Sequence, residues 1–93
     1  MDEFTHVSGK EKADIRLYAL STCVWCRRTR NLLDDLGVSY DFVYVDLLEG
    51  DKKEAIVKQL EKWNPDCSFP TIVLNEKDCI IGFKEDKIRE ALE

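Results

Sequence analysis

The amino-acid sequence predicts an α/β fold, with a four-stranded mixed sheet flanked by three helices in the order βαβ-α-ββα. Short β-branched and aromatic segments alternate with helical patterns through the first two thirds of the chain, which is typical of parallel strands joined by crossovers. The last third holds two such segments joined by a short polar turn, which indicates an antiparallel hairpin. A length of 93 residues allows one domain with a single core.

The first two strands and the helix between them follow from residue pattern. Residues 15–20 form a short β-prone run that ends before a Ser-Thr pair. In residues 26–36 apolar side chains recur at helical spacing, and Gly37 follows as a C-terminal stop. Residues 40–45 are aromatic and β-branched, which favours a second strand. Because a helix separates the two strands, we expect them to be parallel.

A second helix is indicated in the middle of the chain. Asp51 and Glu54 have the spacing of a capping box, which predicts the helix start. Apolar residues recur at helical spacing between Ile56 and Trp63, and Asn64-Pro65 is expected to end the helix.

The C-terminal third predicts a hairpin and a last helix. Residues 70–74 and 78–81 are β-prone, and the polar residues 75–77 join them over a length that suits antiparallel strands. Gly82 ends the second of these strands, and residues 85–92 are expected to form the third helix.

Composition limits the classes of function. Residues 1–13 show no periodicity, so we interpret them as an N-terminal tail or a weak extra strand before one domain at residues 14–93. Hydrophobic residues at 44% and charged residues at 35% exclude a disordered chain, and a net charge of −5 argues against nucleic-acid or membrane partners. Met1-Asp2-Glu3 does not resemble a signal peptide, and no apolar run could span a bilayer. We expect a cytoplasmic monomer.

Two of the four cysteines are arranged for redox chemistry. Cys23 and Cys26 form a C-x-x-C motif where the first strand meets the first helix. A thiol at a helix N-terminus faces unpaired backbone N–H groups and the positive end of the helix dipole, which favour the thiolate. Cys23 is therefore the expected nucleophile, and Cys26, one turn further along, is expected to resolve the mixed disulfide.

Metal binding is the alternative for the same motif. Half of a zinc site has this spacing, but Cys67 and Cys79, the other two cysteines, are separated by eleven residues rather than two. We therefore expect no resident metal. A metal or iron–sulfur cluster carrier that uses the same two thiolates stays open as the second hypothesis.

The chain resembles the glutaredoxins of the thioredoxin superfamily. The residues that carry the resemblance are Leu17 to Cys26, Phe69-Pro70-Thr71 before a strand, and Ile81-Gly82-Phe83 before the last helix. The resemblance implies a thioredoxin-like fold and a thiol–disulfide oxidoreductase with a redox-active Cys23–Cys26 disulfide, and it implies a cis Pro70. The substrate-binding residues implied by it are Val24, Trp25, Phe69, Pro70, Thr71, Gly82 and Phe83.

Three departures from the family bear on the reductant. Val24-Trp25 stands in place of Pro-Tyr, Leu20 in place of a basic residue that contacts glutathione, and Phe83 in place of a glycine. The Cys-Val-x-Cys motif resembles that of the glutaredoxin-like hydrogen donors of ribonucleotide reductase, which thioredoxin reductase reduces. The resemblance thus implies no bound cofactor and three possible reductants, namely glutathione, another low-molecular-weight thiol, or a thioredoxin reductase. The implied partners are protein disulfides, with ribonucleotide reductase among them.

Other residues near the motif have simpler interpretations. Arg27, Arg28 and Arg30 are expected on a solvated helix face, where charge near the thiolate is a secondary reading. Cys79, in a hydrophobic strand, is expected to be buried. The resemblance places the loop of Cys67 beside the active site, so Cys67 is either an inert loop residue or a regulatory thiol.

Overall fold

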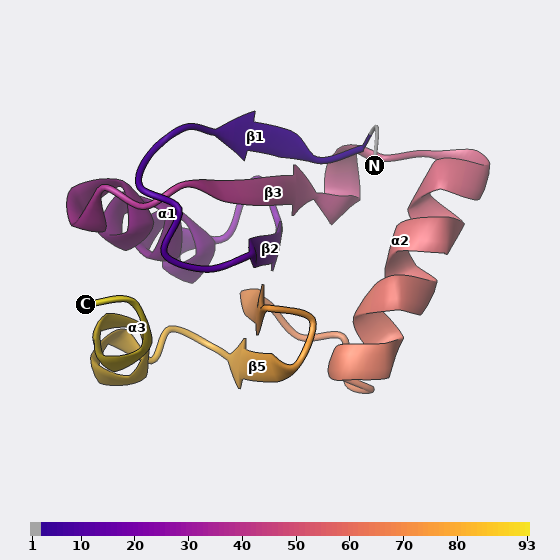
Figure 1. Cartoon of the computed structure of the whole chain (residues 1–93). Coiled ribbons are helices and arrows are strands. Elements are labelled where there is room, and N and C mark those ends of the chain that lie inside the picture. The colour runs from indigo at the N-terminus through magenta and orange to yellow at the C-terminus, as the bar shows by residue number, and fades with distance from the viewer. Residues whose placement is uncertain (1–2) are drawn as a thin grey trace.

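The strands form one five-stranded sheet in the order β1-β3-β2-β4-β5, in a computed structural model that describes residues 3–93 (Figure 1). Strand β2 is parallel to β3, and the other neighbours are antiparallel. The helices and strands, in chain order, are β1 (Thr5–Val7), β2 (Ile15–Ala19), α1 (Val24–Leu36), β3 (Tyr40–Tyr44), the 3-10 helix η1 (Val45–Leu47), α2 (Gly50–Trp63), β4 (Thr71–Leu74), β5 (Asp78–Ile81) and α3 (Glu85–Leu92). The βαβ unit, the hairpin and the three helices are therefore confirmed.

The expected fold is corrected in its number of strands: β1 makes the sheet five-stranded rather than four-stranded. The N-terminal segment thus contains the weak extra strand, which pairs with the edge of β3. Its Thr5 and His6 are exposed, so it lacks the apolar run by which a buried strand is detected. Contacts with residues distant in the sequence hold β1 in place. Phe4 packs edge-on against Tyr18, and His6 Nδ1 lies 2.7 Å from Asp41 Oδ1.

The expected capping box of α2 does not form. The helix begins at Gly50, and Glu49 occupies the N-cap position without a side-chain hydrogen bond. Asp51 already lies inside the first turn, where its charge suits the positive end of the helix dipole but cannot cap.

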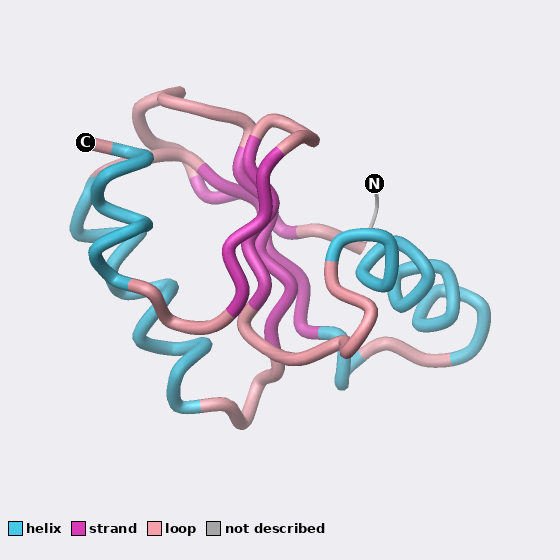
Figure 2. The backbone as a smooth tube through the Cα atoms, turned by 90° about the horizontal axis from the view of Figure 1, so that it is seen from below, coloured by secondary structure: helices cyan, strands magenta, loops and turns pink. Residues whose placement is uncertain are grey.

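Helices cover both faces of the sheet, with α1 and α3 on one side and α2 on the other (Figure 2). The first core cluster lies under α1 and α3 and includes Leu17, Leu33 and Ile88. The second core cluster lies under α2 and includes Tyr18 and Ile56. Neighbouring residues of β2 therefore enter opposite cores, as expected for a central strand that is buried on both faces.

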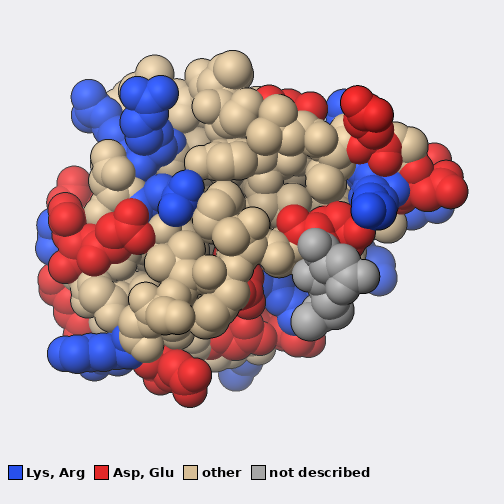
Figure 3. All heavy atoms as spheres, turned by 90° about the horizontal axis from the view of Figure 1, so that it is seen from above, with Lys and Arg blue, Asp and Glu red and all other residues tan. Residues whose placement is uncertain are grey.

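The surface carries charges of both signs. On the face shown in Figure 3, acidic and basic side chains both occur around the rim, and the middle is largely uncharged. Such a surface lacks the single-sign patch that nucleic-acid binding requires on the face shown. No helix among residues 3–93 is both long enough and apolar enough to cross a membrane.

Candidate active site

The strand register brings three separate motifs to one edge of the sheet. Tyr18, near the end of β2, lies opposite Thr71 at the start of β4, and Thr71 lies opposite Ile81 at the end of β5. The segments just beyond these positions are the C-x-x-C motif after β2, Pro70 before β4, and Gly82 after β5. The sheet thus collects at one edge the segments that the sequence suggested for a redox site.

Cys23 is the N-cap residue of α1. Its Sγ accepts a hydrogen bond from the backbone N–H of Cys26 at 3.1 Å, and its own backbone is extended. The residue is half-buried and lines a polar pocket at the surface. A negative charge on this sulfur would be stabilised by the donated N–H and by the aligned peptide dipoles of the helix.

Cys26 lies in a different environment, although only one helical turn separates the two residues. It is 1% exposed and packs in the first core cluster. Burial raises the pKa of the Cys26 thiol from its ordinary value of 9.0 to about 12, and the hydrogen bond with Cys23 and the charges of Cys23 and Asp46 act in the same direction. The backbone of Leu20 partly opposes this increase. At neutral pH Cys26 therefore holds its proton.

An apolar hollow lies beside the dithiol on the β4 side. Its volume is about 220 Å³, and it is lined by Trp25, Phe69, Pro70, Gly82 and Phe83, all of which the sequence suggested for substrate binding. The rings of Trp25 and Phe83 are stacked with centroids 5.8 Å apart, and the guanidinium of Arg28 lies 5.0 Å from the centroid of the Trp25 ring. Trp25 remains 53% exposed, which leaves its ring available for contact with another molecule.

The other two suggested binding residues differ from each other. Val24 is 57% exposed next to Trp25. Thr71 is 0% exposed as a whole residue and donates from Oγ1 to the backbone oxygen of Ser68 at 2.8 Å, so it supports the segment from below rather than offering a surface to a substrate. The Phe69–Pro70 peptide bond is cis, as the resemblance implies.

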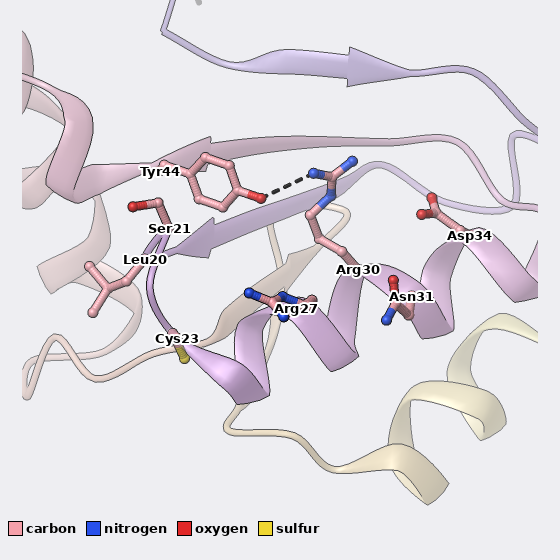
Figure 4. Close-up of a pocket in the computed structure, with 8 residues that line it drawn as sticks. All are labelled: Leu20, Ser21, Cys23, Arg27, Arg30, Asn31, Asp34 and Tyr44. Atoms are coloured by element: carbon pink, nitrogen blue, oxygen red, sulfur yellow. Dashed lines mark hydrogen bonds between the residues drawn. The ribbon is translucent and has the colours of Figure 1, made fainter.

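A second, polar pocket of about 180 Å³ opens on the β3 side of Cys23 (Figure 4). It is lined by Leu20, Ser21, Cys23, Arg27, Arg30, Asn31, Asp34 and Tyr44. The expectation that Arg30 lies on a solvated helix face is wrong. Its guanidinium lies 3.9 Å from the centroid of the Phe42 ring and donates to the hydroxyls of Tyr40 and Tyr44. Arg27, by contrast, is exposed and makes no ion pair within residues 3–93.

Asp46 anchors the loop before Cys23 and was missed by the sequence reasoning. It follows β3, and its two carboxylate oxygens accept hydrogen bonds from the backbone N–H and the hydroxyl of Ser21, at 2.8 and 2.5 Å. These bonds lower the pKa of Asp46, since they stabilise its charged form. An acidic residue directly after a buried strand was the only signal of this role.

The remaining cysteines lie away from the dithiol. Cys67 packs against the second core cluster, whereas Cys23 packs against the first, so the two contact opposite faces of the sheet. Cys79 is half-buried, with Sγ 3.6 Å from the backbone oxygen of Trp63. Within residues 3–93 no three His, Cys, Asp or Glu side chains gather as metal ligands, so a metal held by Cys23 and Cys26 would need ligands from another molecule.

The position of Cys67 predicts its behaviour under oxidation. After mild peroxide treatment, peptide mapping should find the Cys23–Cys26 disulfide, with Cys67 still available for alkylation. Burial raises the pKa of Cys67, and the charges of Glu61 and Asp66 act in the same direction, so little reactive thiolate is present at neutral pH. A Cys23–Cys67 disulfide in the map would contradict this placement.

The fold and the site together define a class, the dithiol oxidoreductases with a thioredoxin-like fold. Within that class, the Glutaredoxin family model matches residues 15–79, and the chain belongs to the glutaredoxin family. The family is one of thiol oxidoreductases, and Cys23 and Cys26 are its C-x-x-C pair in this chain.

Two solved structures from methanogens are similar over nearly the whole chain. The glutaredoxin from Methanosarcina mazei Go1 is 50% identical with a TM-score of 0.88, over 98% of this chain and 88% of that one. The methanoredoxin of Methanosarcina acetivorans is 53% identical with a TM-score of 0.88, over 91% of this chain and 90% of that one. The gene 56 protein of Mycobacterium phage D29 is 34% identical over 79 residues, which are 85% of this chain and 82% of that protein.

Proposed function

We propose that this protein is a dithiol thiol–disulfide oxidoreductase that reduces protein disulfides or small-thiol mixed disulfides through Cys23 and Cys26. The observation that carries the proposal is the contrast between the two sulfurs. Cys23 is half-buried, lines the polar pocket and accepts a backbone hydrogen bond at the helix N-terminus, whereas Cys26 is buried and holds its proton at neutral pH.

The reaction proceeds in two exchanges. The Cys23 thiolate attacks one sulfur of the substrate disulfide, that S–S bond breaks, and the other substrate sulfur leaves as a thiolate that takes up a proton. Cys26 then loses its proton and attacks Cys23 Sγ, which forms the Cys23–Cys26 disulfide and releases the second substrate thiol. Two electrons have passed from the dithiol to the substrate, together with the proton of Cys26 and one proton from solvent, since Cys23 enters the reaction as its thiolate.

The environment of Cys26 suits this order of events. Two of the causes that raise the pKa of Cys26 are its hydrogen bond with Cys23 and the negative charge of Cys23. Both are lost once Cys23 Sγ is bonded to the substrate, since that sulfur is then neutral. Burial, the largest cause, remains, so the pKa of Cys26 falls part of the way after the first exchange, in the direction that favours its attack on Cys23.

Docking of the protein disulfide is assigned to the apolar hollow on the β4 side. The exposed Trp25 ring, stacked on Phe83, offers an apolar surface next to Cys23. We propose that the half-buried Phe69, next to the buried Pro70 and Thr71, contacts an extended substrate segment there through its backbone. Extended segments are recognised through backbone hydrogen bonds and pockets for alternate side chains, so many different protein disulfides could be accepted.

The oxidised protein must be reduced again. We propose that the main reductant is a low-molecular-weight thiol other than glutathione, or a thioredoxin reductase. Leu20, which lines the polar pocket, offers no charge to a glutathione carboxylate. The similarity of Cys-Val-x-Cys to hydrogen donors of ribonucleotide reductase makes that enzyme one candidate target. We further propose that the protein acts as a cytoplasmic monomer.

Leu20→Lys should increase the activity measured with glutathione and glutathione reductase. One charge-assisted hydrogen bond contributes about 1.5–3 kcal/mol, which corresponds to roughly ten- to a hundredfold in affinity. The measurement is the coupled rate of wild type and variant, with Leu20→Met as the uncharged control. Wild-type turnover at the level of a glutathione-dependent glutaredoxin would contradict the proposed preference.

The proposed function is tested by reduction of insulin with each reductant in turn. Purified protein is assayed with glutathione and its reductase, with thioredoxin reductase and NADPH, and with other small thiols. We expect catalysis with at least one small thiol or with thioredoxin reductase. Failure with every reductant, including dithiothreitol, would contradict the proposal.

A further inference from the structure

Asn64 is a buried polar residue whose side chain bonds to the loop after it and to the start of β4. It lies directly after α2 and is 2% exposed. Its Nδ2 donates to the hydroxyl of Ser68 at 2.9 Å, to the backbone oxygen of Ser68 at 3.3 Å, and to Oγ1 of Thr71 at 3.1 Å. Its Oδ1 accepts from the backbone N–H of Asp66 at 3.1 Å.

The bonds of Asn64 join both ends of the loop that carries Pro70. The backbone oxygen of Asn64 accepts from the N–H of Cys67 at 2.8 Å, and Thr71 Oγ1 donates to the backbone oxygen of Ser68 at 2.8 Å. The loop leaves α2 at Asn64 and enters β4 at Thr71, so this network ties its two ends together across the interior. Buried amides persist where their hydrogen bonds are satisfied, and the side chain of Asn64 bonds to Asp66 and Ser68 of the loop and to Thr71 at the start of β4.

The segment held in this way is the one assigned to substrate docking. Phe69 and Pro70 lie between Ser68 and Thr71, the two residues bonded by Nδ2 of Asn64. Both Phe69 and Pro70 also line the apolar hollow beside Trp25. The position of this segment therefore depends on the side chain of Asn64, which is buried and out of reach of a substrate.

A separate set of contacts positions Cys23 and the loop before it. Cys23 is fixed by its N-cap bond with Cys26 N–H, and the preceding loop is fixed by the bonds of Ser21 with Asp46. Neither set shares a hydrogen bond with Asn64. Docking and reactivity can therefore be altered independently.

We propose that Asn64 is a positioning residue for protein-disulfide substrates, which holds the Ser68–Thr71 segment in place for docking without contributing to the reactivity of Cys23. The inference rests on the proposed function and extends it. Loss of Asn64 weakens the binding of a folded or peptide disulfide, which needs the segment. It spares a small disulfide such as 5,5′-dithiobis(2-nitrobenzoic acid), which needs only the thiolate.

The test measures KM and kcat of Asn64→Ala with insulin and with the small disulfide. Losing hydrogen bonds to the loop should raise KM for insulin about tenfold, with kcat and the small-disulfide rate near their wild-type values. The alkylation rate of Cys23 should also be unchanged. Ser68→Ala removes a single exposed acceptor and should raise KM for insulin about two- to threefold, so the inference stays testable even if Asn64→Ala folds poorly.

Val38→Ala is the matched control for stability. Val38 is buried before β3, at the opposite end of the sheet from Cys23, so its truncation lowers stability without touching the loop. Equal losses on both substrates in Asn64→Ala, matched by Val38→Ala, would overturn the inference, as would an unchanged KM for insulin in both loop variants. Wild-type protein inactive on both substrates would instead overturn the proposed function, and the inference with it.

Discussion

Cys23→Ser is expected to abolish disulfide reduction, with a loss of about a thousandfold or more in the rate of insulin reduction. A serine hydroxyl is not ionised near neutral pH and cannot form the mixed disulfide. Serine is a favoured N-cap residue and can accept the bond that Cys23 Sγ takes from Cys26 N–H, so α1 should stay intact. The loss would then reflect chemistry rather than unfolding.

The matched control for this variant is Cys67→Ser. It makes the same atomic change in a cysteine that packs on the other face of the sheet, and it should keep wild-type activity. Thermal unfolding of both variants, followed by circular dichroism, should show that each is folded. Retention of more than about a tenth of the activity in Cys23→Ser would contradict the assigned nucleophile.

Cys26→Ser is expected to stop the reaction halfway and trap the substrate. Cys23 can still attack, but no sulfur remains to attack the mixed disulfide from inside, so the covalent adduct accumulates. The measurement is intact-protein mass spectrometry after mixing with a disulfide peptide and no added thiol, followed by peptide mapping. The adduct should map to Cys23, and turnover should fall to the rate at which free thiol releases it.

A second variant separates this effect from a disturbance of the core. Cys26 is buried, so serine places a hydroxyl among apolar atoms and should lower stability modestly. Cys26→Ala leaves no polar group there, and it should trap the same adduct. Absence of an adduct in both variants would contradict the assigned roles, and an adduct that forms only when Cys23 is replaced would reverse them.

Sequence reasoning succeeded where the signal is local. The central strands and the helices follow from periodicity, and the register of β2, β4 and β5 then brings the C-x-x-C motif, Pro70 and Gly82 to one edge. The position of Cys23 at the start of α1 needed only the boundary between a strand and a helix. The resemblance to glutaredoxins added the cis Phe69–Pro70 bond, which residue pattern alone does not predict.

Features that depend on distant contacts could not be predicted in this way. Asp46 anchors Ser21 across 25 positions of the chain, and Arg30 is covered by aromatic residues of β3 rather than by its own helix. Strand β1 is held by its partner β3 rather than by its own apolar pattern. Asn64 was expected only to end a helix, and its hydrogen bonds to the loop emerge from the folded arrangement.

The resemblance was too coarse to place Cys67. It puts the loop near the active site, and the loop does lead to Pro70 there. Within the loop, however, Cys67 has a positive φ of 52° and packs under α2, away from the face that holds Cys23. The direction of one side chain in a turn is decided by backbone angles that a residue pattern does not specify.

The central claim is that Cys23 supplies the reactive thiolate while Cys26 stays protonated, and the alkylation of reduced wild-type protein tests it most directly. Iodoacetamide labelling at short times, followed by peptide mapping across a series of pH values, measures each cysteine separately. Alkylation needs the thiolate, and a pKa of about 12 instead of 9.0 lowers the thiolate fraction of Cys26 about a thousandfold at neutral pH. We expect Cys23 to be labelled first at neutral pH, with Cys26 labelled only as the pH approaches about 12. Labelling of Cys26 as fast as Cys23 at neutral pH would contradict the account.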